Sequence, residues 1–288
     1  MMKRRDGNII NPTTGQDRLL GMLYGSAAGR LLLRPLVSPV VSKAAGAFLS
    51  SGLSRFLIRP FIRSNRIDME PFEPVQYRSY NEFFSRQIRP EMRPIDQNPA
   101  HLIAPCDSKL TVLKISPDSR LRLKHTDYTL ESLLRDQALA LEYAGGYAMI
   151  FRLTVDDYHR YCYVCDGKKS RNVRIPGVLH TVNPIANDHY PIYKENSREY
   201  SLLSSDIFGD ILMMEVGALL VGKIVNHHEE ASVQRGQEKG YFQFGGSTVV
   251  LLIQPHKALI DPDLLENSRL NIETVVRMGE KIGIAADT

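Results

Sequence analysis

Short apolar runs separated by Gly, Pro, Asp and Asn fill the chain from Leu102 onward. The clearest runs cover residues 110–113, 148–153, 161–164 and 249–253. Runs of this length, bounded by turn-forming residues, predict β-strands. One helical pattern, Leu130–Ala138, interrupts them. The second part of the chain is therefore predicted to be rich in β-structure.

The N-terminal part has a different pattern, in which basic residues are interleaved with apolar ones. No acidic residue occurs between Asp17 and Asp68. Pro35, Pro39 and Pro60 are expected to divide this stretch into short helices. Basic helices with an apolar face suit an anionic membrane surface. The alternative is that the apolar face packs on the protein's own core while the arginines are solvated. An aromatic and basic groove pattern is missing, so no nucleic-acid partner is expected.

These two patterns predict an α+β protein with two parts. The first is a basic, amphipathic helical segment over residues 1–66 that associates with a membrane, and the second is a β-rich domain over residues 67–288. A chain of 288 residues with 43% hydrophobic content can bury a full core. Arg30, Arg34 and Lys43 interrupt the best candidate for a membrane span, and no apolar region follows the basic start of the chain. Neither a spanning helix nor a secretory signal is therefore predicted.

The segment Gly245-Gly246-Ser247-Thr248 lies at a predicted bend between two strand-like runs. Glycine reaches backbone angles that other residues avoid, so this bend can be tight. In a tight bend the Ser247 hydroxyl can fold back onto the carbonyl of its preceding residue, a geometry that suits self-cleavage. The alternative is a turn serine that satisfies backbone groups.

This Gly-Gly-Ser-Thr segment resembles the cleavage motif of the phosphatidylserine decarboxylase proenzyme family, in its Gly-Gly-Ser-Thr branch. The likeness extends over about Tyr80–Gly283, with further similar segments in the family's order at Phe83–Pro90, Ala104–Leu110, Asp156–Tyr161 and Arg277–Gly283. The stretch from Glu215 to Gly240 also resembles half of a hybrid β-barrel of the biotinyl-carrier kind. The resemblance thus implies a catalytic domain of hybrid-barrel-like antiparallel sheets.

The resemblance implies a self-processing enzyme. Cleavage between Gly246 and Ser247 would give fragments 1–246 and 247–288 that stay together as a heterodimer, and Ser247 would become a covalent pyruvoyl group. That cofactor would form a Schiff base with phosphatidylserine and convert it to phosphatidylethanolamine at the cytoplasmic face of the cell membrane, as a peripheral protein. A homodimer is compatible with this picture. The alternatives are a pyruvoyl-dependent decarboxylase of a soluble amino acid and an inactive hybrid-barrel relative that binds membranes.

The family likeness also names the candidates for a relay. Asp107 would orient a histidine, and His159, in an Asp-Tyr-His-Arg motif, would move protons, because histidine titrates near neutral pH. Family members commonly carry a second histidine where this chain has Cys162, and a thiol with a pKa of about 8.5 is a poor general base. We therefore expect either that His180 has taken over as the base or that His159 serves both steps.

The remaining candidate residues are expected to be structural. Cys162 and Cys165 form a Cys-x-x-Cys pair within a strand-like run, and a zinc site would normally need a second pair. His227 and His228 are adjacent, so on a strand they would point to opposite faces and seldom chelate one ion. A polar hairpin loop is the preferred interpretation of this pair, and no metal is expected.

Overall fold

The computed structural model describes residues 1–10, 39–123, 126–177, 195–217, 223–243 and 247–286. Within these residues the protein is a mixed α+β structure with many strands and few helices, as the sequence predicts. The described strands form several open, mainly antiparallel sheets and no closed barrel. The hybrid-barrel detail therefore remains a prediction.

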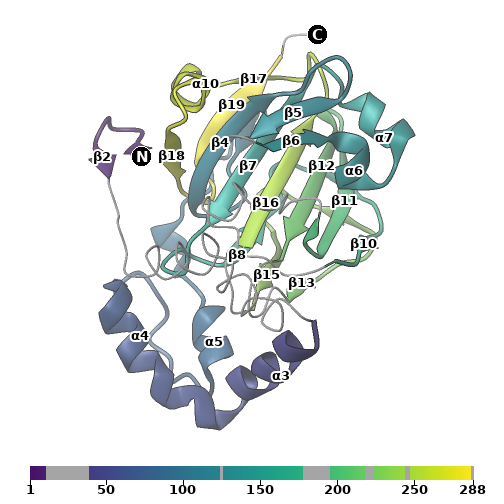
Figure 1. Cartoon of the computed structure of the whole chain (residues 1–288). Coiled ribbons are helices and arrows are strands. Elements are labelled where there is room, and N and C mark those ends of the chain that lie inside the picture. Colours follow the sequence, from purple (N-terminus) through teal and green to yellow (C-terminus); the bar gives the residue numbers. More distant parts are fainter. Residues whose placement is uncertain (11–38, 124–125, 178–194, 218–222, 244–246, 287–288) are drawn as a thin grey trace.

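The largest sheet has eleven strands and runs through the middle of the molecule (Figure 1). Its pairs are antiparallel except for β1 with β18. Its order is β14 (Ala231–Val233), β9 (Gly167–Lys169), β11 (Arg198–Ser205), β12 (Gly209–Val216), β16 (Ser247–Ile253), β7 (Tyr147–Leu153), β4 (Ser108–Lys114), β18 (Glu273–Val276), β1 (Met2–Arg4) and β2 (Ile9–Ile10), while β10 (Val173–Ile175) also pairs with β11.

Three smaller sheets and short helices complete the described part. The sheets are β13 (Ile224–Asn226), β15 (Glu238–Phe242) and β8 (Arg160–Cys162); β17 (Ala258–Ile260), β19 (Lys281–Ala285) and β3 (His101–Ile103); and β5 (Arg120–Leu123) with β6 (Thr126–Thr129). The helices are α3 (Pro39–Ser50), η1 (Gly52–Leu57), α4 (Ile58–Asn65), α5 (Tyr80–Phe84), η2 (Pro90–Met92), α6 (Leu130–Leu134), α7 (Gln137–Glu142) and α10 (Pro262–Arg269).

Strand β16 is buried on both of its faces. Val249, Leu251 and Ile253 belong to the core cluster on one side of the sheet. Val250 and Leu252 belong to a second cluster, which includes the buried leucines of α6. The continuous apolar run at 249–253 is thus explained by a central strand between two cores, and the predicted strand is confirmed.

The predicted helix at Leu130–Ala138 is in fact two helices. Arg135 ends α6 in the left-handed region, with φ of 54°. Asp136 then starts α7, because its side chain accepts a hydrogen bond from the backbone N–H of Leu139. The prediction of one helix was wrong because the apolar pattern does not reveal the two-residue break at Arg135 and Asp136.

Helices α3, α4 and α5 gather at one end of the sheets, opposite α10 (Figure 1). Pro39 is the first residue of α3, whereas Pro60 lies in the first turn of α4 and breaks nothing there. Residues 11–38 of the predicted helical segment lie outside the described residues. No helix within the described ranges is long and apolar enough to cross a membrane.

A third core cluster joins these helices to the rest of the protein. It contains Leu49 of α3, Ile58 of α4, Phe83 and Phe84 of α5, and Tyr158 from the segment between β7 and β8. The helical end therefore packs directly against the residue that precedes His159.

Candidate active site

Ser247 is the first residue of β16, and it pairs with Leu153 at the end of β7. Ser247 is fully buried, and its Oγ has no hydrogen-bond partner within the described part of the chain. The next residue, Thr248, is equally buried and its Oγ1 is also without a partner there. Buried hydroxyls are normally hydrogen-bonded, so two adjacent exceptions at the start of a central strand mark a candidate reactive position. Gly245 and Gly246, and with them the predicted tight bend, lie outside the described residues.

His159 lies between β7 and β8, and the carbonyl oxygen of His159 accepts a hydrogen bond from the backbone N–H of Phe242 at 2.9 Å. Phe242 ends β15, and only four residues separate it from Ser247. The serine and the histidine therefore lie on segments that are linked twice: by the pairing of Ser247 with Leu153, and by the contact of Phe242 with His159.

The His159 ring is enclosed and held in one orientation. Its exposed fraction is 1%, and its centroid lies 4.1 Å from that of the Phe84 ring. Nδ1 lies 3.0 Å from the carbonyl oxygen of Asp157, which makes Nδ1 the protonated nitrogen of the neutral ring. Nε2 is buried without a hydrogen-bond partner among the described residues. A free lone pair on Nε2 is what a general base requires.

Burial lowers the pKa of His159 to about 3. The expectation of a histidine that titrates near neutral pH was therefore wrong for this state of the protein. The imidazole is neutral at physiological pH, and its protonated form is disfavoured because water is excluded around it. It can accept a proton in a short-lived transition state, but it does not stay charged.

The segment that carries His159 is fixed by a buried ion pair. Lys109 Nζ lies 2.6 Å from Asp157 Oδ2, and both side chains are largely shielded from water. Asp157 Oδ2 also accepts from the backbone N–H of Thr154. Asp157 thus uses its carboxylate to anchor the loop and its carbonyl to orient the histidine ring.

Asp107 lies just before β4 and contacts other groups than expected. Arg93 Nε donates to both of its carboxylate oxygens, at 2.8 and 3.0 Å, and the backbone N–H of Met278 donates to Oδ1 at 2.9 Å. Burial by itself would lower the pKa of Arg93, but the hydrogen bond to Asp107 and the negative charge around the guanidinium together raise it. Among the described contacts, the orienting bond to His159 comes from Asp157, so Asp107 as the orienting residue remains a prediction.

Cys162 follows His159 by three residues and is buried in the main core. Burial raises the pKa of its thiol to about 12, so it is not a base at neutral pH. Cys106 and Cys165 are likewise free, buried thiols in the same core. His180, the other candidate for the base, lies outside the described residues.

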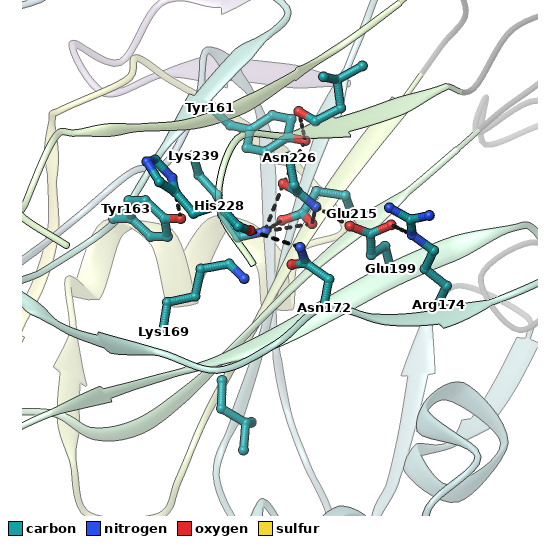
Figure 2. Close-up of polar contacts among 12 residues, drawn as sticks. Tyr161, Tyr163, Lys169, Asn172, Arg174, Glu199, Glu215, Asn226, His228 and Lys239 are labelled. Carbon is teal, nitrogen blue, oxygen red and sulfur yellow. Dashed lines mark hydrogen bonds and ion pairs between the residues drawn. The ribbon is translucent and has the colours of Figure 1, made fainter. Parts of the chain in front are cut away.

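A buried polar cluster connects β15, the strand before Ser247 in the chain, with β12, which pairs with β16 (Figure 2). Lys239 of β15 donates to both carboxylate oxygens of Glu215 on β12, each at 2.8 Å, and both side chains are fully buried. Asn226 bridges Glu215 to Glu199, whose other oxygen accepts from Arg174 at 2.7 Å. In the β12–β16 register Glu215 pairs with Val249, two residues after Ser247. The ion pair therefore fixes the chain ahead of the candidate cleavage point against the sheet that contains Ser247.

His227 and His228 follow β13 in the connection to β14. The predicted hairpin was wrong, because β13 pairs with β15 and β14 pairs with β9, so the connection joins two different sheets. His227 Nε2 lies 2.6 Å from Glu238, and His228 Nδ1 lies 3.2 Å from the Tyr163 hydroxyl. The two rings thus have separate protein partners. No group of three or more potential metal ligands occurs within the described ranges.

A buried serine at the start of a central strand and a buried neutral histidine define a candidate enzyme site on a strand-rich α+β fold. The family model for phosphatidylserine decarboxylase matches residues 80–284. The chain belongs to this family.

Curated relatives agree over nearly the whole chain. The chain is 46% identical over 269 residues to phosphatidylserine decarboxylase proenzyme 2 of Clostridium acetobutylicum, covering 93% of this chain and 92% of that protein. It is 38% identical over 276 residues to the phosphatidylserine decarboxylase proenzyme of Ruminiclostridium cellulolyticum, covering 94% and 92%. It is 36% identical over 288 residues to the proenzyme of Fusobacterium nucleatum, covering 98% and 96%. Membership of the family supports a decarboxylase that is made as a proenzyme.

Sequence reasoning missed three residues around His159. The carbonyl of Asp157 orients the ring, Lys109 anchors that aspartate, and Phe84 covers the ring face. Asp157 stands inside the histidine motif and Phe84 inside another similar segment, so both were visible in the sequence. The contact of Phe84 with His159 joins residues 75 positions apart, and the ion pair of Lys109 with Asp157 joins residues 48 positions apart, so no local pattern encodes either.

Proposed function

We propose that this protein is a self-processing phosphatidylserine decarboxylase whose cofactor, a pyruvoyl group, is made from Ser247. The observation that supports this most directly is the Ser247 hydroxyl, which is buried at the start of the central strand without a hydrogen-bond partner in the described part of the chain. A serine with a merely structural role at such a site would be hydrogen-bonded.

In the proposed maturation, Ser247 Oγ attacks the carbonyl carbon of Gly246 while a histidine accepts the hydroxyl proton. The peptide C–N bond breaks as the C–O bond forms, and the same proton is returned to the amine of Ser247. Loss of the Ser247 α-proton then breaks the new ester bond on the side of the serine, which releases Gly246 as a carboxylate. Tautomerisation and hydrolysis release ammonia and leave the pyruvoyl group at residue 247.

Two candidates remain for the histidine in that step. The geometry of His159 favours it, because Nδ1 is bonded to Asp157 and Nε2 is bare. His180 stays a prediction of the sequence. Cys162 is unsuited, since burial raises the pKa of its thiol to about 12.

The residues present fit a pyruvoyl group at position 247. Its neighbours Leu153, Thr248 and Val249 are buried, so the site excludes water, and the unpartnered Thr248 hydroxyl can donate to a carbonyl oxygen. When present, the group accepts the electron pair that a departing carboxylate leaves behind. The proton that the α-carbon takes up would pass through His159 Nε2 only transiently, because the buried ring does not stay charged. Strand β16 pairs with β12 and β7, so the 247–288 fragment would remain bound after cleavage.

The helical end would present the site to the membrane. Leu53 and Phe56 of η1 are 75% and 68% exposed, and Phe48 of α3 is 42% exposed. Arg55 and Arg59 lie exposed beside them. Exposed apolar side chains with flanking arginines suit an anionic bilayer surface, with apolar groups in the interface and guanidinium groups at the phosphates.

The test is a time course of the purified protein with phosphatidylserine vesicles. We expect two bands on a denaturing gel, a pyruvoyl terminus by intact mass, and release of carbon dioxide. Ser247→Ala should give a single band near 32.5 kDa and release none. A wild-type protein that stays as one band would indicate an inactive relative. A processed protein that decarboxylates a soluble amino acid instead would support the other alternative.

A further inference from the structure

Arg86 is a buried cation that forms no ion pair with any described residue. It follows α5, its exposed fraction is 2%, and its Nε and Nη2 have no hydrogen-bond partner within the described part of the chain. Nη1 reaches only the Phe83 carbonyl oxygen, at 3.5 Å. A guanidinium removed from water needs an ion pair or several hydrogen bonds to offset the loss of hydration.

The acidic side chains around Arg86 are engaged elsewhere. Asp156 and Asp157 both contribute to the charge around Arg86. The carboxylate of Asp157 is bonded to Lys109 and Thr154, and that of Asp156 is hydrogen-bonded to Thr154. Desolvation lowers the pKa of Arg86 to about 10, so it stays charged at neutral pH. The protein therefore maintains a desolvated positive charge with two unused donors.

The guanidinium is held rigidly by aromatic rings. Its central carbon lies 4.2 Å from the centroid of Phe72 and 4.9 Å from that of Phe83. A guanidinium attracted to ring faces can keep its N–H groups for other acceptors. A fixed fork of donors is the arrangement that recognises phosphate or carboxylate oxygens in proteins.

Arg86 also lies close to the candidate active site. The nearby Phe84 packs against the His159 ring at an interplanar angle of 45°. Burial is the main cause of the lowered pKa of His159, and the charge of Arg86 lowers it further. On its other side, Tyr77 contacts Phe83 edge to face with centroids 5.4 Å apart, and the buried Tyr77 hydroxyl lacks a partner within the described ranges.

Tyr77 also lines an open hollow of about 430 Å³, together with Arg55, Phe56, Ile58 and Arg59 of the exposed helical end. A chain of contacts from Tyr77 to Phe83 to Arg86 thus links the hollow to the guanidinium. A lipid headgroup that enters from the helical end would meet Tyr77 first and Arg86 next.

From this geometry we propose that Arg86 binds the phosphodiester of the phospholipid headgroup and so positions the headgroup amine near residue 247. The inference rests on the proposed function. The headgroup of phosphatidylserine has two anions, and the phosphodiester keeps its charge throughout the reaction. A cation fixed on the carboxylate would stabilise the ground state more than the transition state, because that charge leaves the carboxylate as carbon dioxide forms.

The test uses processed wild-type, Arg86→Met and Arg86→Lys proteins with dioctanoyl phosphatidylserine, and calorimetric binding of dioctanoyl phosphatidylethanolamine. The second lipid has the phosphodiester but no carboxylate. For Arg86→Met we expect KM for the first and Kd for the second to rise together, by about 10- to 100-fold, as for a lost charge-assisted hydrogen bond. Arg86→Lys should recover part of both.

Thermal unfolding separates this role from a structural one. Because Arg86 is an unsatisfied buried charge, Arg86→Met should keep or raise Tm. Arg198 is a matched control, since it is also buried but donates to the carbonyl oxygens of Leu133 and Asn196. Arg198→Lys should lower Tm and leave KM and Kd unchanged.

A rise in KM for the serine lipid alone would place Arg86 on the carboxylate and overturn the assignment. Unchanged KM and Kd, or a large fall in Tm in Arg86→Met, would also overturn it. If wild-type protein released no carbon dioxide, the proposed function would fail instead, while the calorimetric comparison would still report on Arg86.

Discussion

The depressed pKa of His159 predicts that the protein loses stability as the pH falls. Burial lowers the pKa to about 3 in the folded protein, whereas the unfolded chain has the ordinary value of about 6.5. Below pH 6.5 the unfolded state therefore binds a proton that the folded state does not. The contribution of His159 to stability is present above pH 6.5 and is lost as the pH falls towards 3.

The size of this effect follows from the two pKa values. Between pH 7 and pH 5 the linkage relation gives a loss of about 2 kcal/mol in the free energy of unfolding from this one group. The residue is 1% exposed, so solvent screening reduces the effect little. A loss of this size is a substantial fraction of the free energy of unfolding of a typical domain, which is about 5–15 kcal/mol.

The assay is urea unfolding at pH 7 and pH 5 in a Ser247→Ala background, where self-cleavage cannot complicate the comparison. We expect the parent to lose about 2 kcal/mol more than His159→Gln between the two pH values. His256→Asn is the matched control, because His256 is exposed and asparagine tolerates its φ of 61°. If parent and His159→Gln lost the same free energy, the histidine would not be buried in neutral form, and the reasoning would be refuted.

Three further outcomes are expected from other parts of the structure. Lys239→Met should lower the free energy of unfolding by about 3–5 kcal/mol, because it leaves the Glu215 charge buried alone. In urea unfolding, the double variant with Glu215→Leu should recover most of this loss. Equal losses in the single and double variants would contradict this. Leu53→Ser and Phe56→Ser should each weaken co-sedimentation with phosphatidylserine vesicles by about 1–2 kcal/mol without changing Tm, and unchanged co-sedimentation would argue against this membrane surface. Cys162→Ala should self-cleave at the wild-type rate in a gel time course, because its thiol stays protonated; a cleavage rate that falls by an order of magnitude would show that the thiol participates.

The pattern of apolar residues along the chain predicted strands correctly where the strand itself is buried. The run Val249–Ile253 is apolar at every position because β16 is covered on both faces, so sequence and structure agree. The break at Arg135 was not predictable in the same way, because arginine has no strong preference for the left-handed conformation that ends α6 there. Backbone geometry at a single residue is decided by the packing of the helices on either side.

The candidate site was predicted as a set of residue types but not as a set of contacts. Ser247 and His159 were found from motifs, yet the bond from Arg93 to Asp107 and the bond from the His159 ring to Asp157 were not. The sequence suggested an aspartate carboxylate behind the histidine, whereas the described contact is a backbone carbonyl, and a carbonyl has no signature in the residue type. The lowered pKa of His159 could not be predicted from the sequence either, because it comes from burial by segments that are distant in sequence.

The unpartnered polar atoms of this protein indicate where its function lies. An unsatisfied buried donor or acceptor costs about 1–3 kcal/mol, so such groups are rare unless a reaction or a ligand uses them. In the described part of the chain they include Ser247 Oγ, His159 Nε2 and two nitrogens of Arg86. In the function proposed above, these atoms belong to the nucleophile, the base and the anion-binding residue. Each of these unpartnered groups costs stability where it stands, which supports a role for each in the proposed processing and decarboxylation.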